Sequence, residues 1–185
     1  HKESSRTYLS KGLVKKAKKI ANENIKLLKN LINEQTPLIG IEPSAILSFR
    51  DEYPELANKE SKDAAENIAR NTFLIDEFLA NEIDKDIITS ELFTDKKLKI
   101  KLHGHCQQKA IASTKQTLKI LSFPKNYIAE EIPSGCCGMA GSFGYEKEHY
   151  ELSMKIGELI LFPAIRNKDD KTIIAANGTS CRCQI

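Results

Sequence analysis

Residues 134–144 have the sequence Ser-Gly-Cys-Cys-Gly-Met-Ala-Gly-Ser-Phe-Gly, in which two adjacent cysteines stand between glycines. Glycine lacks a Cβ atom, so Gly135, Gly138 and Gly141 would let the backbone adopt positive φ and let a bulky group come close. Neighbouring side chains in an extended segment face opposite sides, and a disulfide between adjacent cysteines is strained. Cys136 and Cys137 are therefore expected to reach a common external object, which we interpret as a metal centre.

Around this segment the chain repeats one unit: a strand, a short polar or glycine-containing turn, and a helix. Apolar alternation and short apolar runs predict strands at 37–41, 97–102, 127–132 and 172–176. Apolar residues at spacings of three and four predict helices at about 6–35, after Ser44, at 61–82, over 110–121, and from 146 to a bend or end near Pro163. Four such units predict an α/β fold with Rossmann-like layers, in which helices flank a mainly parallel four-stranded sheet.

Four unusual segments, 42–45, 103–106, 135–138 and 178–183, follow the predicted strands. In parallel sheets, ligands bind beyond the carboxyl ends of the strands, so these segments are expected on one rim. Three of them supply the five cysteines of the chain, which are Cys106, Cys136, Cys137, Cys181 and Cys183. Thiolates are preferred ligands of zinc and of iron–sulfur clusters. The spacing is that of neither a zinc finger nor a ferredoxin, so both metals remain candidates.

Composition narrows the class of protein. The chain has 185 residues with 28 basic and 25 acidic side chains, and a net charge of +3 gives no reason to expect a nucleic-acid partner. The lysines within 15–19 have no aromatic residues between them, so they are interpreted as a solvated face. No apolar run is long enough to span a bilayer, and the first residues do not show the charged segment followed by an apolar segment that is typical of a secretion signal. Paired cysteines in an odd total suit metal ligation in a reducing compartment, which predicts a cytoplasmic location.

At the cysteine segments the chain resembles the cysteine-rich CCG domain, which occurs in heterodisulfide reductases and in the iron–sulfur subunits of glycolate oxidase and anaerobic glycerol-3-phosphate dehydrogenase. His103-Gly-His-Cys106, the block 134–145 and Ser180-Cys-Arg182 are also similar to the C-terminal region of large FAD-linked oxidases akin to D-lactate and D-2-hydroxyglutarate dehydrogenases. The resemblance covers 37–185 and leaves 1–36 as an N-terminal helical segment. Because the chain stops soon after its last cysteine, we expect the CCG domain to continue beyond residue 185.

The resemblance implies an iron–sulfur module of the 4Fe-4S type, a component of an oxidoreductase that is not catalytic by itself. In that family a flavin oxidises a 2-hydroxy acid of the lactate, glycolate or 2-hydroxyglutarate type, and clusters pass the electrons to an acceptor. FAD is expected only in a part of the protein outside this sequence, so the implied partner is a flavin-binding domain or subunit. The implied ligands are Cys106, Cys136, Cys137 and Cys181, with Cys183 ranked below them.

The sequence departs from the family pattern at Ala45, where members commonly have cysteine, and at Gln107, where a histidine is common. Cys183 or a histidine could replace the missing thiolate, the site could stay open, or it could take zinc or no metal. Of His103 and His105, we expect His103 to be the structural hydrogen-bonding residue, and either histidine or Arg182 could offset the charge of a cluster. Two alternatives to electron transfer are a zinc-stabilised domain that docks a flavoprotein and a thiol–disulfide module that uses Cys136 and Cys137.

Overall fold

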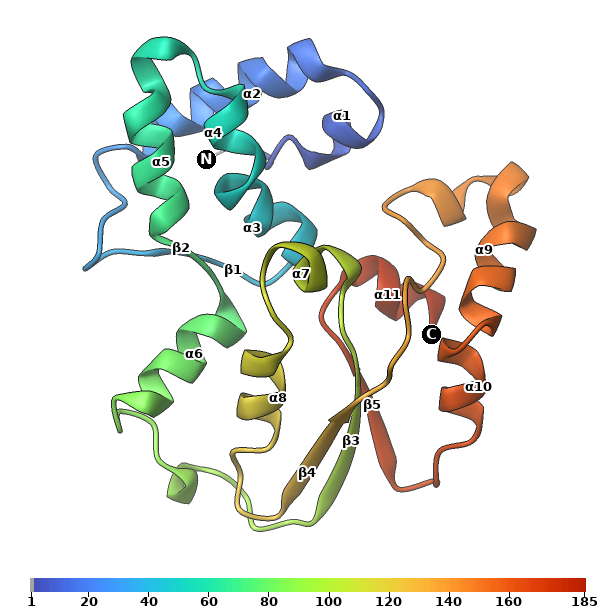
Figure 1. The fold of residues 1–185 in the computed structure, drawn as a ribbon. Coiled ribbons are helices and arrows are strands. Elements are labelled where there is room, and N and C mark those ends of the chain that lie inside the picture. Colours follow the sequence, from blue (N-terminus) through green and yellow to red (C-terminus); the bar gives the residue numbers. More distant parts are fainter. Residues whose placement is uncertain (1) are drawn as a thin grey trace. The chain divides into compact units, whose positions relative to one another are not determined.

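The structure is a computed structural model that describes residues 2–185. The chain divides into two compact units, His1–Ile75 and Asp76–Ile185. Both contain parallel strands and helices, which confirms the α/β class (Figure 1).

The first unit contains a two-stranded parallel sheet, against which α3 packs, and further helices. Its elements are α1 (Arg6–Ser10), α2 (Val14–Leu28), β1 (Leu38–Gly40), α3 (Pro43–Arg50), α4 (Glu52–Leu56), a 3-10 turn η1 (Lys59–Ser61), α5 (Lys62–Arg70) and β2 (Thr72–Leu74). Helix α2 packs against α4 and α5. The buried side chains that hold this unit together include Ala17, Ala21, Ile25, Leu47, Tyr53 and Ile68. The first unit therefore has a core of its own.

Two long helices predicted in this unit are shorter than expected. The helix predicted over 6–35 is divided into α1 and α2 near Gly12, which has φ +70°. Helix α2 ends at Leu28 instead of near residue 35. The helix predicted over 61–82 is interrupted by β2. Asn71 Nδ2 donates to the carbonyl oxygen of Asn67 (2.9 Å), and Thr72 Oγ1 donates to that of Ile68 (2.7 Å). Such side chains compete with backbone hydrogen bonds, which explains why α5 ends here.

The second unit is built on a three-stranded parallel sheet with the order β4-β3-β5. Its strands are β3 (Leu98–His103), β4 (Tyr127–Glu131) and β5 (Thr172–Ala176). Its helices and 3-10 turns are α6 (Ile75–Asp84), η2 (Ser90–Leu92), α7 (Cys106–Ile111), α8 (Lys115–Leu121), η3 (Phe143–Tyr145), η4 (Lys147–His149), α9 (Tyr150–Glu158), α10 (Leu161–Arg166) and α11 (Thr179–Gln184). Helices α7 and α11 follow the carboxyl ends of β3 and β5, as Figure 1 shows.

The prediction of one four-stranded sheet is wrong in one respect. The segment predicted at 37–41 forms β1, which pairs with β2 through the register Leu38↔Thr72 rather than joining the other three strands. A parallel connection needs a crossover of a dozen or more residues, and the segment between these strands supplies one with its own helices. The three strands that precede the cysteine segments do share a sheet, with Leu102 opposite both Glu131 and Ala175.

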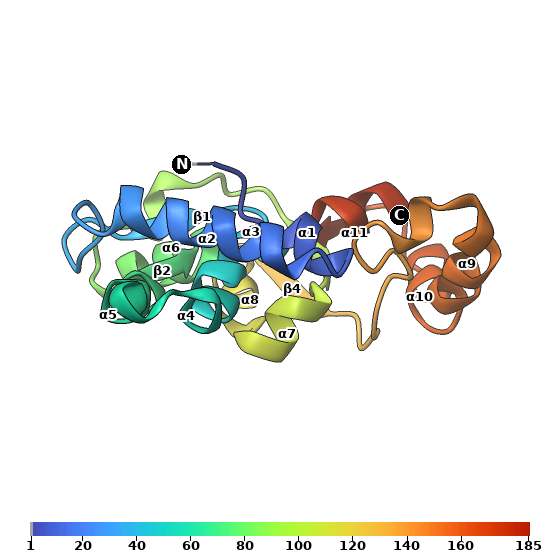
Figure 2. The same ribbon diagram turned by 90° about the horizontal axis from the view of Figure 1, so that it is seen from above.

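The core of the second unit includes two of the predicted ligands. Its buried members are Ile132, Cys137, Met139, Leu161, Phe162 and Cys181. A Cβ atom on Gly157 would collide with the ring of Phe162, so glycine allows α9 and α10 to pack side by side (Figure 2). Within residues 2–185, none of the helices has the length and apolar character needed to cross a bilayer.

Candidate metal centre

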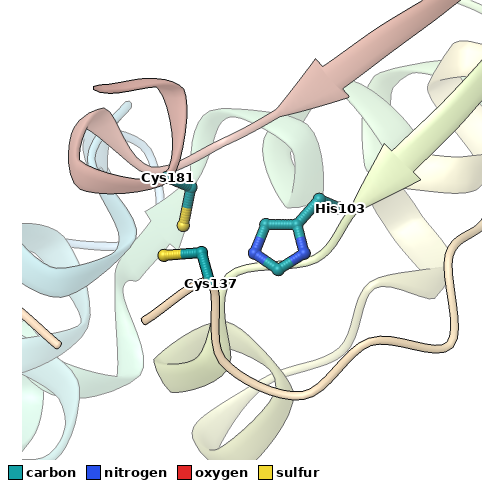
Figure 3. A group of neighbouring side chains, drawn as sticks. All are labelled: His103, Cys137 and Cys181. Carbon is teal, nitrogen blue, oxygen red and sulfur yellow. The ribbon is translucent and has the colours of Figure 1, made fainter. Parts of the chain in front are cut away.

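The candidate centre lies at the carboxyl edge of the three-stranded sheet. His103 is the last residue of β3, Cys137 belongs to the loop after β4, and Cys181 lies in α11 after β5. All three side chains are buried, and one donor atom from each lies within 4.8 Å of the others. Figure 3 shows the two sulfurs facing each other with the imidazole ring beside them. The structure thus brings together donors that are up to 78 positions apart (181 − 103) in the sequence.

Two further thiols extend this group. Cys106 is the first residue of α7, and its thiol and that of Cys136 shift each other's pKa. Cys136 and Cys137 influence each other in the same way. The Cys137 and Cys181 sulfurs lie within 4.8 Å of each other, and they too shift each other's pKa. Four of the five predicted cysteines, all from the second unit, therefore form a continuous series that runs from exposed Cys106 to buried Cys181.

The fifth cysteine lies apart from this series. Cys183 is exposed, and its thiol raises the pKa of the Tyr145 hydroxyl. Cys181 and Cys183 are two positions apart in α11, and residues at this spacing do not face the same side of a helix. Of the substitutes that the sequence offers for the missing thiolate, His103 lies beside the sulfurs, whereas Cys183 does not.

Hydrogen bonds among the thiols produce opposite pKa shifts in the metal-free chain. The hydrogen bond with Cys136 raises the pKa of the Cys106 thiol, and burial raises it further. Hydrogen bonds from Cys106 and Cys137 lower the pKa of Cys136. Hydrogen bonding with Cys137 likewise lowers the pKa of Cys181 to about 5, against the effect of burial. Cys136 and Cys181 are thus the stabilised thiolates, and their neighbours serve as the donors.

The two ring nitrogens of the histidine at the end of β3 differ: one forms a hydrogen bond, and the other forms none within residues 2–185. His103 is 0% exposed, and its Nδ1 lies 2.7 Å from Ser134 Oγ. Its Nε2 is buried without a hydrogen bond to any described residue. A buried unpaired nitrogen is costly unless something binds it. Metal-bound histidines commonly donate from the other ring nitrogen, as the Ser134 hydroxyl allows here. The structural hydrogen bond expected of His103 is thus made by Nδ1, whereas Nε2 remains open to a ligand.

His105 has a different position. Its Nδ1 accepts the backbone N–H of Gln107 (3.2 Å), so it caps α7. A Cβ atom on Gly178 would collide with its ring and would lie 3.3 Å from Cys181 Sγ, which places this glycine between the ring and the sulfur. The absence of a side chain at Gly178 therefore leaves room for the His105 ring beside the start of α11.

The double-cysteine loop is held by its backbone. Gly138 has φ +103°, and a Cβ atom there would collide with the carbonyl oxygen of Ser153. The N–H of Gly138 donates to Cys136 Sγ at 3.3 Å. By contrast, a Cβ atom on Gly135 would meet no atom within 4 Å. Gly141 has φ +71°, so two of the three glycines predicted to support the loop have backbone conformations that favour glycine.

Two side chains outside the predicted set anchor this loop. Lys109 of α7 donates from Nζ to the carbonyl oxygens of Ser134 (2.6 Å) and Gly135 (3.3 Å). Gln184 of α11 donates from Nε2 to the carbonyl oxygen of Cys137 (3.0 Å). Gln184 belongs to the segment that resembles the FAD-linked oxidases, but no role was predicted for it, and no motif marked Lys109. Their spacing from the cysteines, three positions after Cys106 and three after Cys181, was the only available signal.

Arg182 points its guanidinium at the backbone that leads into α11. It donates to the carbonyl oxygens of Ala176 (3.2 Å) and Asn177 (2.9 Å) and to Thr179 Oγ1 (3.2 Å). The structure therefore gives Arg182 the role of fixing the end of β5.

These donors fit a soft metal. Two buried thiols and a buried imidazole nitrogen converge, with Cys136 packed against the same apolar cluster, and such sulfur and nitrogen donors select zinc, copper(I) or iron–sulfur clusters over hard cations. The fold and the site together define an α/β unit that carries a cysteine–histidine cluster at the carboxyl edge of a parallel sheet.

The chain is similar to parts of larger dehydrogenases. It is 29% identical over 178 residues to D-2-hydroxyglutarate dehydrogenase of Haemophilus influenzae, a match that covers 95% of this chain and 17% of that protein. It is 26% identical over 182 residues to one of the subunits of anaerobic glycerol-3-phosphate dehydrogenase of Escherichia coli K12, with 96% and 43% covered. D-2-hydroxyglutarate dehydrogenase of Pseudomonas putida is 28% identical over 169 residues, with 90% and 15% covered.

The chain thus spans less than half the length of each of these relatives. No family model and no solved structure matches it. The prediction that the chain is a component of an oxidoreductase is confirmed, because the relatives are dehydrogenases and the chain corresponds to only one part of each.

Proposed function

We propose that this chain is the electron-transfer module of an FAD-linked dehydrogenase that oxidises a 2-hydroxy acid. In this proposal Cys106, Cys136, Cys137 and Cys181 hold an iron–sulfur cluster of the 4Fe-4S type, in a CCG domain. The observation that supports it is the convergence of His103, Cys137 and Cys181 at one edge of a sheet, with the thiols of Cys136 and Cys106 next to this group. The similarity to dehydrogenases over nearly the whole chain supports the reaction class.

When bound, such a cluster supplies a one-electron relay between a flavin and an acceptor. The residues of the chain would prepare its surroundings. Met139, Leu161 and Phe162 are buried around the inner sulfurs and exclude water there. The N–H of Gly138 faces Cys136 Sγ, and hydrogen bonds to cluster sulfurs are one of the means by which proteins set the potential. Exposed Cys106 would give a redox partner short access to the centre.

The partner that delivers electrons would be a flavin-binding domain or subunit. The much greater length of the relatives supports this, since the matched segment leaves most of each dehydrogenase for other tasks. The series of free thiols supports a reducing compartment, so we place the module in the cytoplasm.

A second candidate is a zinc site that stabilises a docking domain. His103, Cys137 and Cys181 present three donors within 4.8 Å, which suits one tetrahedral ion with Cys106 or Cys136 as the fourth ligand. Imidazole together with thiolate is a common ligand set for structural zinc.

Anaerobic reconstitution distinguishes these functions. The chain is incubated with iron and sulfide, or with zinc, and the bound iron, acid-labile sulfide and zinc are counted after gel filtration. The proposal predicts a brown protein with iron and sulfide in equal amounts, whereas stoichiometric zinc in a colourless protein would favour the second candidate. Cys137→Ser should lose the cluster, and the matched variant Cys183→Ser should keep it. Equal loss from both variants would contradict the assignment of ligands.

A further inference from the structure

A buried carboxylate in the second unit links the segments that carry the outer and inner cysteines. Asp76 lies in the first turn of α6 and is 3% exposed. Its Oδ2 accepts hydrogen bonds from Gln108 Nε2 (3.0 Å), from Asn177 Nδ2 (3.0 Å) and from the hydroxyl of Thr117. Its Oδ1 accepts the backbone N–H of Glu77 (3.0 Å). A carboxylate buried this deeply is tolerated because donors surround it.

The donors also bond to one another. Asn177 Nδ2 lies 3.0 Å from Gln108 Oε1, and Gln108 Nε2 lies 2.9 Å from Thr117 Oγ1. Gln108 is 0% exposed and also donates to the carbonyl oxygen of Ser113 (3.1 Å). The four side chains therefore form a closed network in which loss of the carboxylate would leave several buried donors without their acceptor.

The positions of the donors connect this network to the metal centre. Gln108 is two residues after Cys106 in α7. Asn177 directly follows β5 and is four residues before Cys181. One carboxylate thus fixes the backbone that carries Cys106 and the backbone that carries Cys181, although it lies in a different helix from both.

We propose that Asp76 is a positioning residue for the metal centre, which holds Cys106 against Cys136 and Cys181 against Cys137 before any metal binds. The inference depends on the proposed function only for which metal or cluster the thiols bind. Sites whose donors are arranged in advance by a hydrogen-bonded outer shell bind metal more tightly than sites that must be assembled.

The first test needs no metal. The full chain, reduced and metal-free, is treated with the thiol cross-linker dibromobimane, and the linked peptides are identified by mass spectrometry. Wild type should give Cys106–Cys136 and Cys137–Cys181 products. Asp76→Ala should lower the yield of both. Asn177→Ala removes the hydrogen bonds between the network and the residue after β5, whereas Asp76 keeps its hydrogen bond from Gln108 of α7, so this variant should lower the Cys137–Cys181 yield and leave the other product. This second variant keeps the test decisive if Asp76→Ala does not fold.

Asp84→Ala is the matched control. Asp84 lies in the same helix and forms an exposed ion pair with Lys119 of α8, so its removal loosens α6 without touching α7 or β5. Far-UV circular dichroism and urea unfolding confirm that each variant folds. Unchanged product yields in a folded Asp76→Ala chain, or an equal fall in Asp84→Ala, would overturn the inference.

The second test titrates the same variants with cobalt(II) and follows thiolate-to-cobalt absorption. The dissociation constant should rise by about 10- to 100-fold in Asp76→Ala, as for other outer-shell partners of metal ligands, and should not change in Asp84→Ala. An unchanged constant in Asp76→Ala would overturn the inference. If wild type bound neither cobalt nor an iron–sulfur cluster, the proposed function would fail, while the cross-linking result would still decide whether Asp76 arranges the thiols.

Discussion

At the scale of single residues, the candidate centre depends on which side chain atoms are left without a partner. His103 bonds to Ser134 through Nδ1 and directs a buried Nε2 toward two sulfurs. The cysteines could be found from the sequence because paired thiols next to glycines are conspicuous. The second role of His103 could not, since alternation along an extended segment does not tell which of His103 and His105 faces the sulfurs.

The loop glycines allow a residue-scale prediction. Gly138→Ala should lower the free energy of unfolding of the metal-free chain by about 2 kcal/mol or more, because the substitution combines an unfavourable φ of +103° with a collision against Ser153. Urea denaturation measures this change. Gly135→Ala, in the same loop but with open space around it, is the control and should stay within about 0.5 kcal/mol of wild type. A similar loss in both variants would contradict the role given to the Gly138 backbone.

At the scale of elements, periodicity located the helices and strands better than it located their ends. The residues expected to form a helix after Ser44 do so, but the helix is capped at Glu42 with Pro43 in its first position, which suits the fixed φ of proline. The predicted helix over 110–121 is divided between α7 and α8, and the one from 146 breaks at 159–160, before Pro163. Such breaks depend on side-chain hydrogen bonds and packing, which a pattern of apolar residues does not encode.

Helix α7 allows an element-scale prediction. Lys109→Met should release the contact between this helix and the loop before the cysteines, because its ammonium group bonds to two loop carbonyl oxygens. Hydrogen–deuterium exchange should then become faster at the amides of 134–138, with a loss of about 1 kcal/mol of stability. Lys115→Met, an exposed lysine at the start of α8, serves as the control. Unchanged exchange in Lys109→Met would contradict the anchoring role.

At the scale of the whole molecule, the sequence predicted the parallel α/β architecture and the gathering of cysteines at one edge, but not the division into two sheets. Composition and local patterns identify strands, whereas strand pairing depends on contacts between distant segments. The short strand β1 forms its backbone hydrogen bonds with β2, whose residues lie within the helix predicted over 61–82. The boundaries 1–36 and 37–185, drawn from the family resemblance, stay a prediction.

The second unit contains all four of the proposed thiol ligands as well as His103 and Asp76. A chain limited to 76–185 should therefore fold and bind the same amount of iron and sulfide as the full chain. Circular dichroism and metal counting check this expectation. A folded fragment that bound no metal would show that residues of 2–75 supply something essential.

X-ray absorption at the iron edge of the anaerobically reconstituted full chain tests the central claim most directly, because it reports which atoms surround the metal. The account predicts a first shell dominated by sulfur together with iron–iron scattering, and loss of both signals in Cys137→Ser but not in Cys183→Ser. A first shell made only of oxygen and nitrogen, or sulfur ligation without iron–iron scattering, would contradict an iron–sulfur cluster held by the converging thiols.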